Sequence, residues 1–223
     1  MAMVPNRQQI IDAFLALLAE KPFEKIGHAA IAEKAGVSLS DMRGEFGSTF
    51  DILSAFARET DRKVLAGGEK EDAPSTARDR LFDVLMRRFE TLQPHREAIR
   101  SLARSAERSP SFAVALNRLA VRSQQWMLSA AGIDSSGWIG GLRAQGVAVL
   151  YARVMRVWLN DDDPGLARTM AELDRDLATG ARFATLLDDL CRLAPRCPPR
   201  RRRSRDAGPR HTPGQSEPET MRA

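Results

Sequence analysis

The side chains that most often carry chemistry are sparse in this sequence. It holds three histidines (His28, His95 and His211) and two cysteines (Cys191 and Cys197). None of them belongs to an H-x-x-x-H or C-x-x-C pair, and the sequence has no G-x-S-x-G or G-x-x-x-x-G-K-S/T motif. Nucleophilic and metal-assisted catalysis both need several such groups at close spacing. The sequence therefore predicts a protein that is not an enzyme, with no catalytic residues, no metal site and no cofactor.

Three further groups invite a chemical interpretation, and each also has a structural one. The acidic run Asp161–Asp163 precedes Pro164 at a predicted helix boundary, where the dipole of the next helix favours negative charge. His28 falls at the start of another predicted helix, a position more typical of capping than of a general base. The two cysteines have no histidine nearby, so we expect ordinary thiols in a reducing cytoplasm.

The secondary-structure elements that must position any functional residue are predicted to be helices throughout the chain. The chain contains one tyrosine, no alternating Val/Ile/Thr run and no Asn-Gly hairpin turn, so strands are not expected. Apolar residues recur at helical spacing instead, which predicts an all-α fold of about nine helices. Pro22 ends the first predicted helix, Gly36 the second, and Ser38 and Ser48 cap the next two. Later helices are expected near residues 76–91, 96–107, 111–131, 137–160 and 165–194.

Residues 26–53 have the pattern of a helix-turn-helix. A short helix carries Ile31 toward the core, Gly36 supplies the backbone freedom of a tight turn, and a second short helix runs from Ser38 to about Phe46. Met42 and Phe46 lie four residues apart and would anchor that second helix. This leaves four residues facing outward, where the base edges of a DNA duplex would lie: Leu39, Ser40, Arg43 and Gly44.

Three stretches here resemble the TetR family of transcriptional regulators. They are IAEKAGVS (31–38), Phe46-Gly47-Ser48 and the hydrophobic pair Ile52-Leu53, and with length and helical character the resemblance covers residues 1–195. It implies a DNA-binding head over residues 1–50 and a helical ligand-binding and dimerisation domain over residues 51–195. It further implies a homodimer that binds palindromic double-stranded operator DNA, as a repressor, and releases it when a small ligand enters the domain.

The resemblance and the outward positions together give a set of candidate DNA contacts: Lys25, Ser38, Leu39, Ser40, Arg43, Gly44 and Thr49. Arg43 stands where the family usually has an aromatic residue and Thr49 where it usually has a lysine, and both usual residues contact phosphates. An arginine fork can replace one phosphate contact. Arg7, Lys25 and Arg43 together would form a basic stripe on the head.

The charge of the head leaves a second interpretation open. Residues 1–47 hold five basic and six acidic side chains, whereas affinity for DNA depends largely on neutralised phosphates. The acidic head and the missing lysine favour a protein of the same fold that binds an apolar ligand or lipid and no DNA. Proteins of the ubiquinone-biosynthesis lipid-binding type resemble this second case.

The second half of the chain carries the candidate ligand and dimer residues. Large aromatic and sulfur-containing side chains suit a pocket for a small apolar ligand, of unknown identity, and we expect it to be lined by Phe89, Trp126, Tyr151 and Met155. Apolar stripes on the last two predicted helices would form a two-fold interface. Its candidate residues are Val147, Leu150, Val154, Phe183 and Leu187.

Net charge is concentrated in a final segment. The chain of 223 residues has a formal charge of +5, and residues 196–223 hold eight arginines against three acids, which accounts for all of it. That segment also has five prolines and few large apolar residues, so we expect a disordered basic tail. No run of about 18 apolar residues occurs, which predicts no membrane span, and without an export signal we expect a cytoplasmic protein.

Overall fold

The computed structural model describes residues 7–68 and 76–193, with side chains described up to Gly180. Within these ranges the chain forms nine α-helices, two short 3-10 helices and no strand, so the all-α fold class is confirmed. The α-helices are α1 (Arg7–Glu20), α2 (His28–Ala35), α3 (Leu39–Glu45), α4 (Thr49–Ala66), α5 (Ala77–Leu92), α6 (Arg96–Arg108), α7 (Pro110–Ala130), α8 (Gly137–Trp158) and α9 (Ala167–Leu193). The 3-10 helices are η1 (Phe23–Lys25) and η2 (Gln93–His95).

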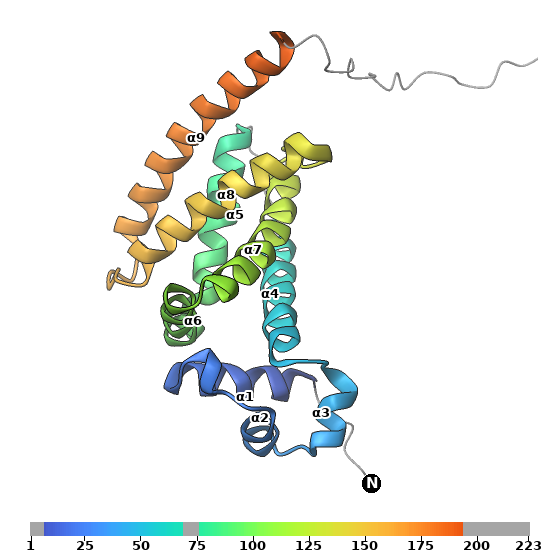
Figure 1. Cartoon of the computed structure of the whole chain (residues 1–223). Helices are drawn as coiled ribbons and strands as arrows, with labels where there is room; N and C mark the ends of the chain where they lie inside the picture. The colour runs from blue at the N-terminus through green and yellow to red at the C-terminus, as the bar shows by residue number, and fades with distance from the viewer. Residues whose placement is uncertain (1–6, 69–75, 194–223) are drawn as a thin grey trace, which may run out of the picture.

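The helices form a small lower head and a larger upper bundle (Figure 1). The head consists of α1, α2 and α3, and α4 runs from it into the bundle made with α5, α7 and α8. Helix α6 packs on α1 as well as on α7, so the head meets the bundle at two places. Helix α9 packs along α8 and α5 at the outer side of the bundle.

Helix starts follow the capping residues in the sequence. The Ser38 and Ser48 hydroxyls accept hydrogen bonds from the backbone N–H groups of Asp41 (3.0 Å) and Asp51 (3.2 Å), as predicted for α3 and α4. Gly36 ends α2 with a φ of +66°, the left-handed conformation that glycine adopts without strain. These local signals fix the relative lengths of α2, the turn and α3.

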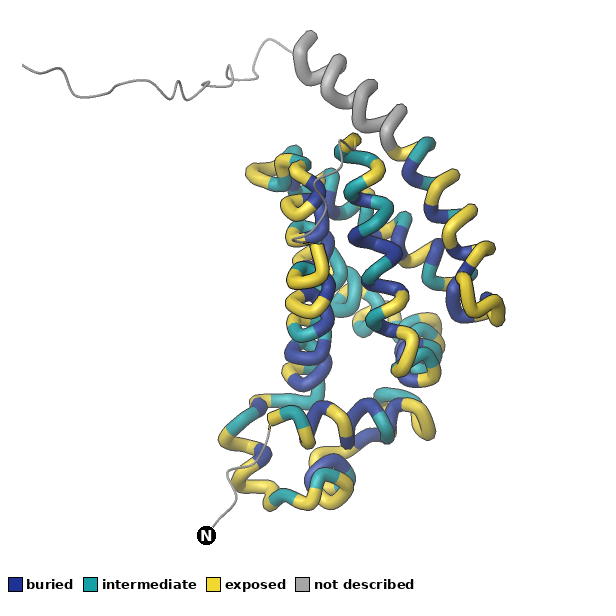
Figure 2. The backbone as a smooth tube through the Cα atoms, turned by 180° about the vertical axis from the view of Figure 1, so that it is seen from behind, coloured by how far each residue is buried: buried dark blue, intermediate teal, exposed yellow. Residues whose placement is uncertain are grey.

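An aromatic cluster joins the head to the bundle. Phe112, near the start of α7, stacks on Phe23 of η1 with a centroid distance of 4.4 Å and meets Phe50 of α4 edge-on at 6.4 Å. Phe23 also meets the fully buried Phe14 of α1 edge-on at 6.2 Å. Buried residues extend from the head through α4 into the bundle, while exposed residues cover the lower end of the head (Figure 2). Head and bundle therefore share one hydrophobic core.

The basic tail expected at residues 196–223 lies outside the part of the chain that the structure describes. Among the described residues, no helix is both long enough and apolar enough to cross a bilayer.

Candidate functional site

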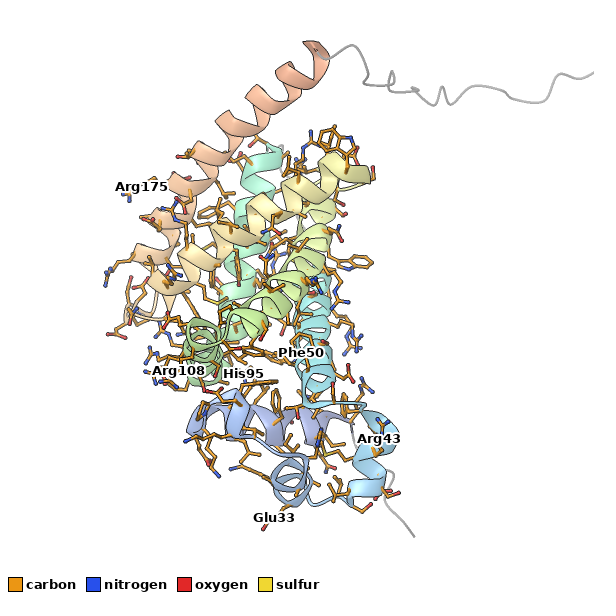
Figure 3. All side chains as sticks on the ribbon, viewed as in Figure 1. Glu33, Arg43, Phe50, His95, Arg108 and Arg175 are labelled. Atoms are coloured by element: carbon orange, nitrogen blue, oxygen red, sulfur yellow. The ribbon has the colours of Figure 1, made fainter. Side chains whose placement is uncertain are left out.

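Helix α3 presents its polar side to solvent at the edge of the head. Its buried anchors are Met42 and the following Phe46, while Leu39 keeps 55% of its surface exposed despite being apolar. Ser40, Arg43 and Gly44 are exposed on the same helix, and Arg43 (labelled in Figure 3) donates a hydrogen bond of 3.4 Å to the backbone carbonyl of Phe46. The outward face predicted from the sequence is thus present, because the anchors at i and i+4 hold the opposite face against the head.

The acidic residues of α3 are occupied by contacts within the head. The Arg7 guanidinium lies 3.2 Å from the Glu45 carboxylate and 4.3 Å from the centroid of the Phe46 ring. Asp41 accepts a hydrogen bond of 2.7 Å from the Ser38 hydroxyl that caps its own helix. Arg7 therefore neutralises Glu45 rather than joining Lys25 and Arg43 in the basic stripe that the sequence suggested.

Two helix N-termini meet beside α3. Thr49 is the first residue of α4 and His28 the first of α2, and the Thr49 hydroxyl lies 3.4 Å from Nε2 of His28. His28 starts a helix, as predicted from its position. Lys25 is exposed at the end of η1, and Ser38 is exposed at the cap of α3. The candidate DNA contacts thus lie at the head surface, with Thr49 half-buried.

A cavity of about 780 Å³ lies within the bundle, between α4, α5, α6, α7 and α8. Apolar side chains from all five helices line it, among them Leu53, Leu92, Ile99, Leu116 and Met155. Its volume falls within the range of pockets for small-molecule ligands. We call it the large cavity.

One wall of the large cavity carries a polar network. Arg88 of α5 forms a buried ion pair with Asp61 of α4, and the Ser123 hydroxyl of α7 donates a hydrogen bond of 2.7 Å to the same carboxylate. The Arg88 guanidinium also lies 5.6 Å from the centroid of the Tyr151 ring. The sequence motifs do not predict this network, although Asp61 and Arg88 interrupt the apolar stripes of their helices.

Two further polar groups on that wall lack partners among the described residues. They are the side-chain amide of Gln124, which is only 1% exposed, and the Tyr151 hydroxyl. Tyr151 stacks on Phe89 at 4.5 Å, so its ring is held in place. Burial raises the pKa of the Tyr151 phenol, against the opposing effect of the Arg88 charge, so the hydroxyl stays protonated at physiological pH.

The ligand residues predicted from the sequence are partly brought together. Tyr151 and Met155 line the large cavity, whereas Phe89 lies behind Tyr151 and is fully buried. Trp126 is 62% exposed and does not line the cavity, so the structure does not place it beside Tyr151 and Met155. It lies two positions after Gln124 on α7, about 200° around the helix, and therefore on the opposite face.

The predicted dimer residues differ in how far they are buried within their own chain. Val154 is fully buried within its own chain because α8 packs against α5, α7 and α9, so it is not free to meet a partner. Val147 and Leu150 are half-buried against the core. The side chains of Phe183 and Leu187 lie outside the described residues. The exposed large apolar side chains of α8 and α9 in the described part are Trp138, Leu142, Val149 and Met170.

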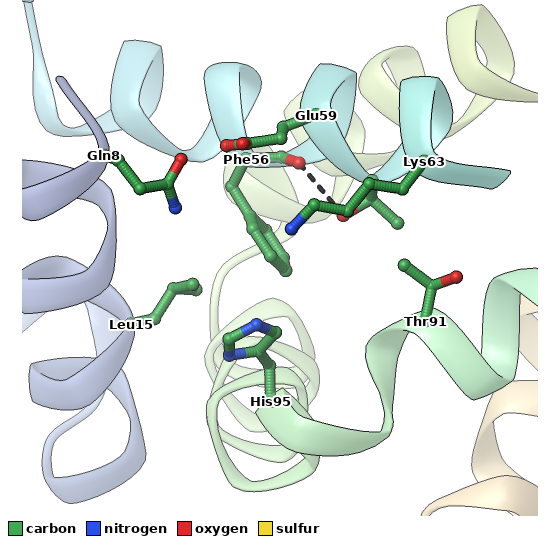
Figure 4. Close-up of a pocket in the computed structure, with 8 residues that line it drawn as sticks. Gln8, Leu15, Phe56, Glu59, Lys63, Thr91 and His95 are labelled. Atoms are coloured by element: carbon green, nitrogen blue, oxygen red, sulfur yellow. Dashed lines mark hydrogen bonds between the residues drawn. The ribbon is translucent and has the colours of Figure 1, made fainter. Parts of the chain in front are cut away.

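A second, smaller pocket lies where α1, α4 and η2 meet (Figure 4). His95 meets Phe56 edge-on there, with a centroid distance of 5.2 Å. Burial lowers the pKa of His95, Lys63 lowers it further and Asp12 opposes the shift. Phe56 and Thr60 line both this pocket and the large cavity.

The acidic run at the start of α9 serves the helix boundary. Asp161 accepts hydrogen bonds from the backbone N–H (2.8 Å) and hydroxyl (2.7 Å) of Thr169, and Asp163 accepts one of 3.0 Å from the backbone of Ala167. Burial opposes ionisation of Asp161, but the Thr169 hydrogen bonds outweigh it and lower its pKa. Among the described residues, no group of three histidine, cysteine or acidic side chains is arranged to hold a metal ion.

Comparison with solved structures identifies the fold. A TetR transcriptional regulator from Nitrosomonas europaea matches with a TM-score of 0.62 at 21% identity, over 79% of this chain and 98% of that one. A TetR-family regulator from Streptomyces coelicolor matches with a TM-score of 0.56 at 18% identity, over 85% and 86% of the two chains. The regulator FadR from Bacillus subtilis, solved with stearoyl-CoA, matches with a TM-score of 0.50 at 19% identity, over 78% and 99%.

No protein-family model matches the sequence, and none of the curated proteins matches it. The structural similarity therefore establishes that the chain has the fold of TetR-family regulators, as the sequence motifs led us to expect.

Proposed function

We propose that this protein is a cytoplasmic, ligand-responsive transcriptional regulator that binds operator DNA as a homodimer and acts as a repressor. One observation carries the proposal: the outward face of α3. Met42 and Phe46 are buried, while Ser40 and Gly44, each about 160° around the helix from Met42, are exposed together with Leu39 and Arg43 at the edge of the head. A short helix held in this way can enter the major groove of a duplex.

The internal ion pair of the head supports DNA binding despite the unfavourable charge count. Because Arg7 neutralises Glu45, that carboxylate repels phosphates less than its exposure on α3 would suggest. Arg43 and Lys25 are the proposed phosphate contacts, and the N-termini of α2 and α4 at His28 and Thr49 add partial positive charge. Ser38, Leu39, Ser40 and Gly44 are the proposed contacts to base edges.

The large cavity is the proposed ligand site, with Tyr151 and Met155 on its wall. FadR from Bacillus subtilis, which shares this fold, was solved with stearoyl-CoA. That complex supports our proposal that a protein of this fold holds a ligand within or beside its helical bundle. We propose that occupation of the large cavity lowers the affinity for operator DNA.

The proposed dimer forms through the outer face of α8. Trp138, Leu142 and Val149 lie at intervals of four and seven residues, so they share one face of the helix, and all three are exposed. A two-fold DNA site requires two heads related by two-fold symmetry. Leu142→Arg would place a charge in this interface, and we expect it to shift the protein to monomer in size-exclusion chromatography coupled to light scattering.

The test of DNA binding is selection from a random duplex library, followed by titration of the selected sequence. Unlabelled competitor DNA of unrelated sequence is added to suppress any non-specific binding through the arginine-rich residues 196–223. Arg43→Ala should weaken operator binding about tenfold and flatten the dependence on salt by about one phosphate contact. Arg175→Ala removes the same charge on α9, far from α3 (Figure 3), and should leave the affinity unchanged. Equal effects of the two variants would contradict the proposal.

The alternative function is binding of an apolar molecule or lipid without DNA recognition. The specific observation in its favour is the head, with five basic against six acidic residues and a threonine at position 49. If this function is correct, selection returns no preferred duplex, and an apolar molecule copurifies with the protein and is identified by mass spectrometry.

A further inference from the structure

We propose that the large cavity takes an elongated amphiphile with two different polar ends. A neutral amide-like group sits at the inner end against Gln124 and Tyr151, an apolar body fills the middle, and an anionic group lies at the outer end near Arg104 and Arg156. This inference rests on the proposed function only in taking the large cavity as the ligand site. It does not depend on DNA binding.

The inner end is marked by unsatisfied polar atoms. Both amide atoms of Gln124 and the hydroxyl of Tyr151 lack hydrogen-bond partners among the described residues, and both side chains are nine-tenths or more buried. Both residues line the large cavity. Leaving an amide buried and unpaired opposes folding, so these side chains are best explained by a partner that enters the cavity.

The chemistry of these atoms selects a neutral partner. The Gln124 amide offers one acceptor and one donor group side by side, which complements another carboxamide. Tyr151 adds a hydroxyl that remains neutral. The nearby charges, Arg88 and Asp61, already neutralise each other, so the inner wall gains little from a charged ligand group. A carboxamide or similar donor–acceptor group meets all these conditions.

The outer end of the cavity has a positive balance. Arg100 and Arg104 of α6 and Arg156 of α8 line the large cavity, and Glu107 is the one acidic residue among its lining residues. Arg100 is already bonded to the carbonyl of Leu159 and paired with Glu97 at 3.1 Å. Arg104 and Arg156 are exposed and form no ion pair within the part of the chain that the structure describes, so their guanidinium groups are available to an anion.

The two ends are separated along α7. Lining residues on this helix run from Ala113, close in sequence to Arg104 and Glu107 of α6, to Gln124. Eleven residue steps at 1.5 Å per residue give a span of about 16 Å along α7, whereas the backbones of Tyr151 and Arg156 on α8 are only about 7.5 Å apart along the helix axis. The long side chain of Arg156 must therefore extend away from Tyr151 to reach the outer end. Between the two ends the lining is largely apolar, including Leu116, Leu119 and Ala120. A linear ligand with an apolar body therefore fits better than a compact one.

Three probes of equal chain length test the assignment by isothermal titration calorimetry with the full-length protein. Dodecanedioic acid monoamide has a carboxylate at one end and a carboxamide at the other. Dodecanoic acid lacks the carboxamide, and dodecanamide lacks the carboxylate. We expect the monoamide to bind about tenfold more tightly than either single-ended probe, which corresponds to about 1.4 kcal/mol.

Variants assign each end to its residues. Gln124→Leu should remove the advantage of the monoamide over dodecanoic acid without lowering the Tm of the free protein, and Tyr151→Phe should reduce it while keeping the stack on Phe89. The double variant Arg104→Gln/Arg156→Gln should remove the advantage over dodecanamide. Gln125→Leu, a neighbouring substitution that does not line the cavity, is the matched control and should bind all probes as the unaltered protein does.

Failure of this inference can be told apart from failure of the proposed function. If no probe binds, or if Gln124→Leu keeps the preference for the monoamide, the ligand class is wrong. Operator binding measured on the same preparations is independent of that outcome. Loss of operator recognition with normal probe binding would instead refute the DNA-binding function and leave the ligand assignment standing.

Discussion

Removing one member of the buried ion pair between Arg88 and Asp61 should be more damaging than removing both. The two side chains are 9% and 11% exposed, and Ser123 donates to the same carboxylate. Asp61→Leu leaves a buried guanidinium without its counter-charge, and Arg88→Met leaves a buried carboxylate. Breaking a buried pair in this way costs about 3–5 kcal/mol. We take about 3 kcal/mol, because the adjoining large cavity gives water some access to the remaining charge.

The double variant Asp61→Leu/Arg88→Met should recover most of this loss, since replacing both partners with apolar residues is often nearly neutral. Urea unfolding of all four proteins gives the coupling free energy by a double-mutant cycle. In thermal unfolding each single variant should lose about 6–12 °C in Tm, for about 3 kcal/mol in a chain of this size. The pair Glu59–Arg62, in which Arg62 is 78% exposed and Glu59 is half-buried, serves as the control, with a coupling below about 1 kcal/mol. A double variant as unstable as the sum of the two single variants would refute the reasoning.

Three further expectations concern the head and its junction. Ser48→Ala removes the cap of α4 and should lower the free energy of unfolding by about 1 kcal/mol in urea titrations, whereas Ser48→Asp should retain it. Phe112→Ala removes the ring between Phe23 and Phe50, so amide hydrogen exchange in α1 and α2 should quicken more than in α9; uniform change would contradict this. The pKa of His95 is lower in the folded state than in the unfolded state. As the pH falls, the unfolded state therefore takes up a proton before the folded state does, so the free energy of unfolding is highest above about pH 6.5 and decreases below it. His95→Gln should flatten that part of the stability profile measured by urea unfolding between pH 7 and pH 5.

Local signals in the sequence were sufficient for the helices and the head. Ser38 and Ser48 cap their helices, Gly36 ends α2, and Met42 with Phe46 anchors α3, as their spacing predicted. Such features depend on residues within one or two helical turns of each other, so the sequence displays them directly.

Features that depend on tertiary packing were harder to predict. The spacing of Val154 identifies an apolar face of α8 but not which helix covers it, and its own chain does. Trp126 has the side chain of a ligand contact, an aromatic ring with an N–H group, but its position on α7 is opposite to that of Gln124. The wall of the large cavity did leave a signal: Asp61, Arg88 and Gln124 are polar residues at core positions of otherwise apolar helix faces, and all three are buried.

The ring of Phe56 forms a boundary between two compartments. One side belongs to the large cavity, and the other touches His95 in the small pocket that α1 closes with Gln8 and Leu15. If the proposed ligand displaces this ring, we expect the packing of α1 to change, and α1 carries Arg7, which pairs with Glu45 of α3. Thermodynamic linkage would make such an effect reciprocal, so a duplex bound as we propose would change the affinity of the large cavity for its ligand by the same factor. Phe56, together with Thr60 one turn further along α4, is thus shared by the ligand site we propose and the pocket beside the head.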